Sequence, residues 1–248
     1  MKPILLELGP LTVRTWGVMV ALAFLASMTY VIREASKKGI ERDKIINLAF
    51  FMLISGMIGA RIVFVLTQPS YYIQHPAEIF MIHQGGLAIH GGVLGGAIAT
   101  YFFAKRNKIS FIGIADILAP ALILGQGIGR LGCFFAGLCY GKETDFLIRF
   151  KFFGVEGLRH PTQLYESGLD FLAFGLLIMF QDRFKKKGVL FATSVIVYSA
   201  IRFMTEIIRD SMVIAYGITY AQAASAVIII IFGTYLVKTL KTPDSTLQ

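Results

Sequence analysis

Three arginines of this chain lie within or directly after apolar stretches. Arg61 and Arg202 lie inside runs of hydrophobic residues and Arg130 follows one, with few acidic residues beside them. A charge at membrane depth costs at least ~2.5–3.5 kcal/mol, so such side chains usually face a partner or a water-filled cavity. A guanidinium group presents its donors in a fixed fork that suits phosphate. The arginines therefore predict a site for an anion, and the commonest anion in a membrane is a lipid phosphate.

Arg130 has the strongest case of the three. It follows the glycine-spaced sequence GQGIG at residues 125–129, at the end of an apolar run. The structural alternative is an ion pair with Asp116 or Glu206. Asp116 lies about four turns away along the same predicted helix, which disfavours that pair. Arg61 has the weakest case, because small residues precede it and helix packing explains it equally well.

Arg202 belongs to a second charged group. Arg202, Glu206 and Arg209 are spaced i, i+4 and i+7, so they share one face of a predicted helix. Glu206 can then hold one arginine while the other faces a ligand. An ion-pair ladder that satisfies itself is the alternative, and Arg209 is close enough to the helix end to extend to the membrane surface.

A histidine stands between glycine pairs in the sequence GGLAIHGGVLGG, residues 85–96. His90 titrates near neutrality, so it can accept a proton from a weak acid such as a thiol. Its glycine neighbours let a ligand or a second helix approach the backbone closely. A histidine hydrogen-bonded within a helix-packing seam is equally compatible with this context.

The sequence HPTQLYE at residues 160–166 leads into another apolar run. Pro161 and Glu166 both suit the first turns of a helix, so helix initiation explains them. Helix initiation does not explain why His160, Gln163 and Tyr165, all with polar ends, gather near the predicted membrane surface.

Cys133 and Cys139 are the only cysteines. Their spacing is not a metal-binding pattern by itself, and no nearby histidine pair completes one. We interpret them as two small apolar residues near a crowded backbone, and we expect no metal site.

The composition places these residues in a membrane protein. The 248-residue chain is 56% hydrophobic and 16% charged, which is typical of a polytopic membrane protein. The net charge of +9 comes largely from Lys and Arg between apolar runs, where they suit cytoplasmic loops and anionic headgroups. No basic helix with interleaved aromatic residues indicates a nucleic-acid partner.

An all-α fold with about seven transmembrane helices follows from the apolar runs, because a span needs about 20 mostly apolar residues. The seven runs are Val13–Ile32, Ile45–Leu66, Leu87–Ala104, Phe111–Ile128, Leu164–Phe180, Val189–Ile208 and Ile218–Val237.

Basic residues between the runs predict the orientation. By the positive-inside rule the N-terminus lies outside and the C-terminus in the cytoplasm. The basic residues at 142–159 are an exception on the predicted outer side. We expect one domain over residues 1–248, with a short interfacial arm near 70–84 and an outer-face loop near 130–163. An apolar face of Ile73, Ile79, Phe80 and Ile82 would hold the arm in the interface.

Four segments together resemble the prolipoprotein diacylglyceryl transferase family. They are GGLAIHGGVLGG at 85–96, GRLGCFFAGLCYG at 129–141, RHPTQLYE at 159–166 and RFMTEIIR at 202–209. They occur in the family's order across nearly the whole chain. The resemblance implies transfer of an sn-1,2-diacylglyceryl group from phosphatidylglycerol to the lipobox cysteine of a preprolipoprotein signal-peptide segment. Glycerol 1-phosphate leaves and a thioether remains, in the bacterial inner membrane.

The resemblance also assigns residues. It implies catalytic roles for His90, Arg130 and Arg202, and it implies no metal or organic cofactor. It implies phosphatidylglycerol contacts for Arg130, Arg202, Gly91, Gln126, Glu206, Arg209 and Trp16. Two positions depart from the family: many members have asparagine at Cys133 and tyrosine at Trp16.

A transporter of anions or lipids is the main alternative, because it also explains buried arginines and glycine-rich helix contacts. It would move its lipid unchanged and would need no group that activates a nucleophile. A structural assembly factor leaves His90 and Arg130 without a reason.

Overall fold

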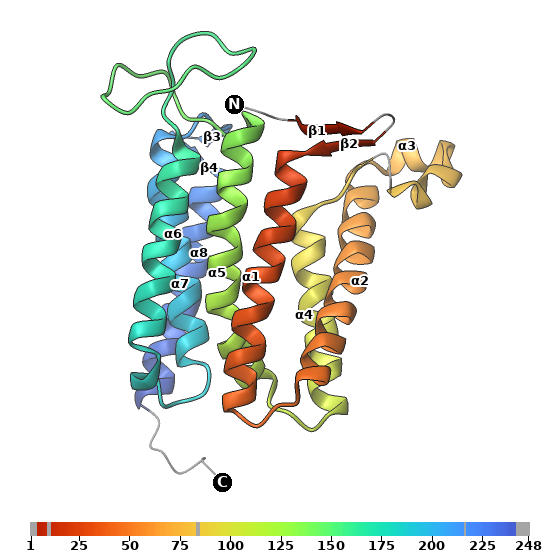
Figure 1. The fold of residues 1–248 in the computed structure, drawn as a ribbon, viewed down its shortest axis with the longest axis vertical. Coiled ribbons are helices and arrows are strands. Elements are labelled where there is room, and N and C mark those ends of the chain that lie inside the picture. The colour runs from red at the N-terminus through yellow and green to blue at the C-terminus, as the bar shows by residue number, and fades with distance from the viewer. Residues whose placement is uncertain (1–3, 9–10, 83–84, 216, 242–248) are drawn as a thin grey trace. The chain divides into compact units, whose positions relative to one another are not determined.

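The computed structural model describes residues 4–8, 11–82, 85–215 and 217–241 and is mainly helical (Figure 1). The described residues include seven helices of at least 18 residues: α1 (Thr15–Lys37), α2 (Arg42–Thr67), α4 (Ile89–Arg106), α5 (Phe111–Ala136), α6 (Thr162–Met179), α7 (Val189–Ile208) and α8 (Tyr220–Lys241). Five of them, α1, α2, α5, α7 and α8, are long and apolar enough to cross a membrane. This confirms a helical, polytopic membrane protein.

Two features differ from the sequence-based expectations. The helix expected to end at Ile128 continues to Ala136, so Arg130 lies inside α5 and the loop begins at Gly137 instead of near residue 130. Two short antiparallel hairpins were not predicted. They pair β1 (Ile4–Leu8) with β2 (Leu11–Arg14) and β3 (Val213–Ala215) with β4 (Ile218–Thr219).

The chain forms two compact units, one of residues 32–114 and a larger one of residues 1–31 and 115–248. In the smaller unit, α2 and α4 run side by side (Figure 1). Glycines make this contact close, because Gly91 lies against the Gly59 backbone and Gly95 against the Ser55 backbone. The Ser55 hydroxyl also donates a hydrogen bond to the Gly95 carbonyl, at 2.9 Å. Small residues four apart on both helices therefore allow backbone-to-backbone packing.

We expect Gly95→Ala to destabilise this helix pair by at least ~1–3 kcal/mol, because the new methyl group would overlap the Ser55 carbonyl oxygen. Gly96→Ala is the matched control, since its methyl group would meet only Met52 Cε, at 3.8 Å. The unfolding free energies of the two purified variants test this prediction, and Gly95→Ala should have the lower value. Equal stability would show that the close contact does not limit the packing of α2 and α4.

Arg61 organises the segment that connects α2 to α4. This segment contains α3 (Pro69–Gln74) and the 3-10 helix η1 (Pro76–Phe80). The buried guanidinium donates to the carbonyls of Glu78, Ile79, Gly85 and Gly86. Arg61 was interpreted either as part of an anion site or as a residue of helix packing. These contacts support the structural role.

The predicted interfacial arm coincides with this segment. Ile73 and Phe80 are 79% and 84% exposed, so two members of the predicted apolar face are free to contact lipid. Placement in the interface stays a prediction, and residues 83 and 84, at the end of the predicted arm, lie outside the described residues.

Arg61→Lys should loosen the arm, because a lysine ammonium cannot reproduce the fork that reaches four carbonyls. Lost hydrogen bonds from a charged donor should cost at least ~2 kcal/mol. Amide hydrogen exchange should rise across residues 69–82. Arg42→Lys serves as the control, since Arg42 is an exposed residue at the start of the same helix. Unchanged exchange in Arg61→Lys would contradict this role.

In the larger unit, α5 packs closely against other helices through its glycines. Gly125 and Gly132 lie beside Ser27 and Met19 of α1, and Gly127 lies beside Asp170 of α6. Apolar residues of α5, α6 and α7 form the core, namely Ile123, Ala173, Leu177, Leu190 and Ile201. The glycines that suggested a helix end are therefore contact points of a continuous helix.

Asp116, near the start of α5, connects this helix to the start of α7. Its carboxylate accepts hydrogen bonds from the Gly188 and Phe191 amides, at 2.7 and 2.8 Å. A carboxylate suits the N-terminus of a helix, where amide donors lack partners within the helix. Asp116 thus has a helix-capping role and is not the partner of Arg130.

Candidate active site

A buried carboxylate lies among three arginines in the larger unit. Glu166 Oε1 is 2.7 Å from Nη2 of Arg130, and Oε2 is 3.8 Å from Nη1 of Arg202 and 3.7 Å from Nη1 of Arg209. The Glu166 side chain is only 1% exposed. Arg202 Nη2 also lies 2.7 Å from Glu206 Oε2, which confirms the predicted pairing along α7. We call Arg130, Glu166, Arg202, Glu206 and Arg209 the arginine cluster.

The arginine cluster has donors that make no hydrogen bond with the described residues. Arg130 Nε, Arg202 Nη1 and Arg209 Nη1 are buried, and the two Nη1 atoms face Glu166 Oε2 only at ion-pair distances of 3.8 and 3.7 Å. The three arginine side chains nevertheless keep 12%, 19% and 14% of their surface exposed, so a small group can reach them. Buried donors without acceptors are costly, and an anion would satisfy them.

Loop hydrogen bonds hold the helix ends that carry the cluster. At the start of α6, the Thr162 hydroxyl donates to the Cys139 carbonyl and the Gln163 amide donates to the Leu138 carbonyl. The Lys142 amide donates to the Ile208 carbonyl at the end of α7. The loop after α5 is thereby fixed to both α6 and α7, which brings their charged residues together.

Arg209 reaches Glu166 because it lies just beyond α7. It is the C-cap residue of this helix, with an extended backbone. Arg202 and Glu206 share a face of α7 as expected, but Arg209 lies outside the helix. Its guanidinium meets Glu166 of α6 instead of standing free at the membrane surface.

A second polar contact lies one turn from the cluster. Gln126 Nε2 of α5 donates to the Tyr198 hydroxyl of α7, at 3.1 Å. Gln126 and Tyr198 each precede an arginine of the cluster by four residues, so their hydrogen bond connects the helices that carry Arg130 and Arg202.

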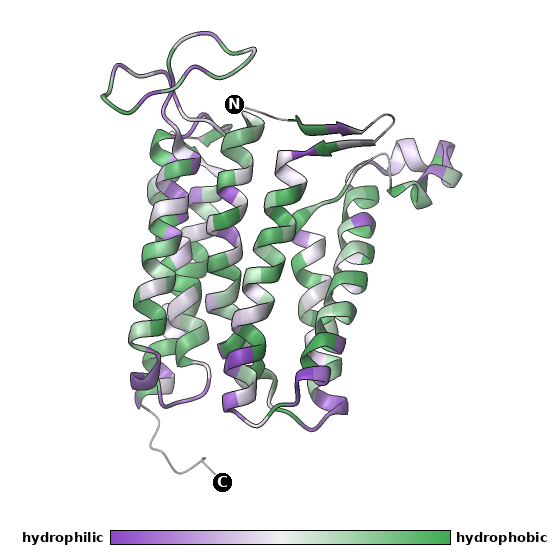
Figure 2. Ribbon diagram, viewed as in Figure 1, coloured by the Kyte–Doolittle hydropathy of each residue, from purple (hydrophilic) through white to green (hydrophobic). Residues whose placement is uncertain are grey.

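Asp170, four residues after Glu166, is fully buried, and neither carboxylate oxygen has a hydrogen-bond partner among the described residues. Figure 2 shows the resulting hydrophilic stretches inside α5 and α6.

His90 and Gly91 belong to the smaller unit. His90 is the second residue of α4, is exposed, and makes no hydrogen bond with the described residues of its own unit. Gly91 is buried against α2, so its position serves the packing of the two helices. An imidazole at an open helix start is available to a substrate, and a headgroup contact of Gly91 stays a prediction.

Trp16 lies beside α5 in the larger unit, Cys133 is part of α5, and Cys139 follows it. Trp16, on α1, is 48% exposed, and its ring borders Gly132. Cys133 and Cys139 are free thiols that are partly buried. A hydrogen bond from the Cys133 thiol lowers the pKa of Cys139, and the charges of Arg209 and Arg130 lower it further. Two arginines of the cluster therefore act on Cys139, which the interpretation of the cysteines as small apolar residues did not include.

The sequence-based argument missed Glu166 and Tyr198. Glu166 was explained as a helix-start residue, although it lies more than one turn inside α6 and is almost fully buried. A signal was present, because Gln163, Glu166 and Asp170 recur on one face of an otherwise apolar helix. Tyr198 carried no comparable signal, since a single tyrosine in an apolar helix usually packs in the core.

Comparisons with known proteins cover nearly the whole chain. The sequence model of a family described as prolipoprotein diacylglyceryl transferase matches residues 3–238. A phosphatidylglycerol--prolipoprotein diacylglyceryl transferase of Staphylococcus saprophyticus is 40% identical over 244 residues, which cover 92% of this chain and 86% of that protein.

Two further relatives carry the same name. The protein of Symbiobacterium thermophilum is 37% identical over 252 residues, covering 97% of this chain and 94% of the relative. The protein of a Nostoc species is 36% identical over 243 residues, covering 90% and 84%. Similarity at this level therefore extends through both units.

Proposed function

Because the chain belongs to the prolipoprotein diacylglyceryl transferase family, we propose that it transfers a diacylglyceryl group from phosphatidylglycerol to the lipobox cysteine of a preprolipoprotein. The products are a thioether-linked lipoprotein precursor and glycerol 1-phosphate. The arginine cluster is the observation that supports this function best, because it offers a phosphate buried donors that make no hydrogen bond with the described residues.

The reaction requires the thiol to lose its proton and the phosphate to leave. The sulfur attacks the glycerol carbon, a C–S bond forms, and the C–O bond to phosphate breaks with its electron pair moving to the phosphate oxygen. A free thiol has a pKa of ~8.5 and is mostly protonated at neutral pH, so a base assists the attack. The leaving phosphate monoester gains negative charge, which donors already in position stabilise.

The arginine cluster performs the second task in this proposal. Arg130 and Arg202 bind the phosphate, while Glu166 and Glu206 keep the guanidinium groups oriented. Arg209 adds a third donor at the same carboxylate. Gln126, Gly91 and Trp16 complete the proposed phosphatidylglycerol contacts.

His90 performs the first task, either as the base that takes the thiol proton or as a residue that positions the headgroup. His90→Gln separates these roles. Loss of a base lowers kcat with little change in KM, whereas loss of headgroup positioning raises KM. Full turnover by His90→Gln would exclude the base. His75→Gln is a suitable control, because His75 is an exposed residue of the connecting segment.

The proposed setting is the bacterial inner membrane. Seven spans place the N-terminus outside and the C-terminus in the cytoplasm, with α4 and α6 as the two additional spans. Each of these helices has 18 residues, and α6 carries the carboxyl groups of Glu166 and Asp170. The cluster would then lie toward the outer surface, where exported preproteins arrive.

The direct test mixes the purified protein with phosphatidylglycerol and a lipobox peptide, and the peptide is then weighed by mass spectrometry. We expect one diacylglyceryl group on the cysteine. A peptide with serine at that position should stay unmodified, and phosphatidylcholine should not replace phosphatidylglycerol. An unmodified cysteine peptide, with an active family member run in parallel, would contradict the proposed function.

A further inference from the structure

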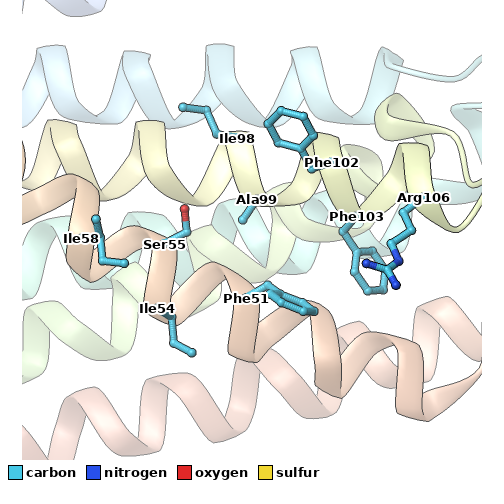
Figure 3. Close-up of a pocket in the computed structure, with 9 residues that line it drawn as sticks. All are labelled: Phe51, Ile54, Ser55, Ile58, Ile98, Ala99, Phe102, Phe103 and Arg106. Carbon is cyan, nitrogen blue, oxygen red and sulfur yellow. The ribbon is translucent and has the colours of Figure 1, made fainter.

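A groove lies on the smaller unit between α2 and α4, away from the residues assigned to catalysis. Its volume is about 330 Å³, and Phe51, Ile58, Ile98 and Phe102 contribute to its walls (Figure 3). Phe51 and Phe102 are 58% and 62% exposed, so the groove is open along one side. No described residue of this groove belongs to the arginine cluster or to the His90 segment.

Small residues account for the hollow. Ser55 and Ala99 lie between the larger side chains of the two helices (Figure 3). The Ser55 hydroxyl already donates to the Gly95 carbonyl, so it offers no unsatisfied donor to a ligand. The groove is therefore apolar along its length, and helix backbones leave no free donors there for a peptide strand.

A single basic side chain stands at one end of the groove. Arg106 is the last residue of α4, is exposed, and makes no hydrogen bond or ion pair with the described residues of its unit. From Ile98 to Arg106 the helix rises about 12 Å, at ~1.5 Å per residue. An apolar channel with a guanidinium group at its end matches an acyl chain that continues into a phosphate headgroup.

We propose that this groove binds one acyl chain of an anionic phospholipid, whose phosphate is held by Arg106. The lipid belongs to the leaflet on the side where α4 ends in Lys105 and Arg106. By the positive-inside rule this is the cytoplasmic leaflet. α2 is apolar and long enough to cross the membrane, so its groove face meets hydrocarbon. This binding is independent of the transferase reaction.

The test uses the full chain in lipid nanodiscs with phosphatidylglycerol or phosphatidylcholine that carries a photoreactive acyl chain. Cross-linked peptides are mapped by mass spectrometry. We expect labelling concentrated in residues 51–58 and 98–106, with phosphatidylglycerol preferred. Arg106→Gln should lower phosphatidylglycerol labelling about fivefold, which corresponds to the loss of one basic contact at a membrane surface.

Two further variants sharpen the result. Lys105→Gln removes the neighbouring charge, which does not line the groove, and should leave labelling unchanged. Ala99→Phe fills the hollow and should abolish labelling there, while retained transferase activity shows that the protein is folded. Equal effects of Arg106→Gln and Lys105→Gln would overturn the proposal. So would labelling spread evenly over all apolar helices, or a groove covered by a second copy of the chain.

Discussion

Glu166→Ala should destabilise the protein by about 3–5 kcal/mol and remove its transferase activity. The Glu166 carboxylate is 1% exposed and lies within 4 Å of three guanidinium groups. Removing one member of a buried ionic group leaves the remaining charges uncompensated, which is the source of the expected loss. The arginines should then repel one another and lose the orientation that a phosphate requires. Chemical unfolding measures the first effect, and the peptide assay measures the second.

Glu41→Ala is the matched control for this change. Glu41 also forms an ion pair, with Lys44 at 2.8 Å, but its side chain is 71% exposed. Exposed pairs of this kind contribute about 0–1 kcal/mol, so Glu41→Ala should be nearly silent. Similar losses of unfolding free energy and of transferase activity in the two variants would show that Glu166 does not hold the arginine cluster together.

Arg130→Ala should lower turnover by about 10²–10³-fold, the usual effect of removing one donor that stabilises developing charge. Arg130 contributes both the contact to Glu166 and a buried Nε without a partner. Arg130→Lys should recover little activity, because an ammonium group cannot contact the carboxylate and a phosphate with fork geometry. The initial rate of peptide modification, measured at saturating phosphatidylglycerol, reports this loss.

Arg149→Ala controls for a general loss of positive charge near the outer loop. Among the described residues Arg149 forms an ion pair with Asp145, at 3.4 Å, and the two side chains are 39% and 107% exposed. It should keep wild-type turnover. If Arg130→Ala retained activity comparable to Arg149→Ala, the phosphate would have to bind elsewhere.

The sequence predicted the helices well because hydrophobic length decides them. The bounds of α7 match the apolar run at Val189–Ile208, and the other helices lie within a few residues of their runs except at the end of α5. There, glycines that usually end helices instead permit contact with α1 and α6. Their role depends on neighbours that are distant in the chain, so local preference gave the wrong boundary.

The arginine cluster was predicted only in part for a similar reason. The Arg202–Glu206 pair follows from helix geometry and could be predicted from spacing alone. Glu166 has its partners on α5, on α7 and just beyond α7, and no local pattern specifies such contacts. The residues next to Arg61 in the sequence likewise do not indicate that its guanidinium donates to four backbone carbonyls from a later segment.

The most direct test of the central proposal counts the two products together. The protein is incubated with phosphatidylglycerol labelled in its glycerol headgroup and with the lipobox peptide. Water-soluble glycerol phosphate and lipidated peptide are then quantified from the same reaction. The transferase mechanism predicts one glycerol phosphate released for each diacylglyceryl group on the peptide, with both products lost in Arg130→Ala. Intact phosphatidylglycerol crossing the membrane, with no glycerol phosphate formed, would contradict it and indicate a lipid transporter.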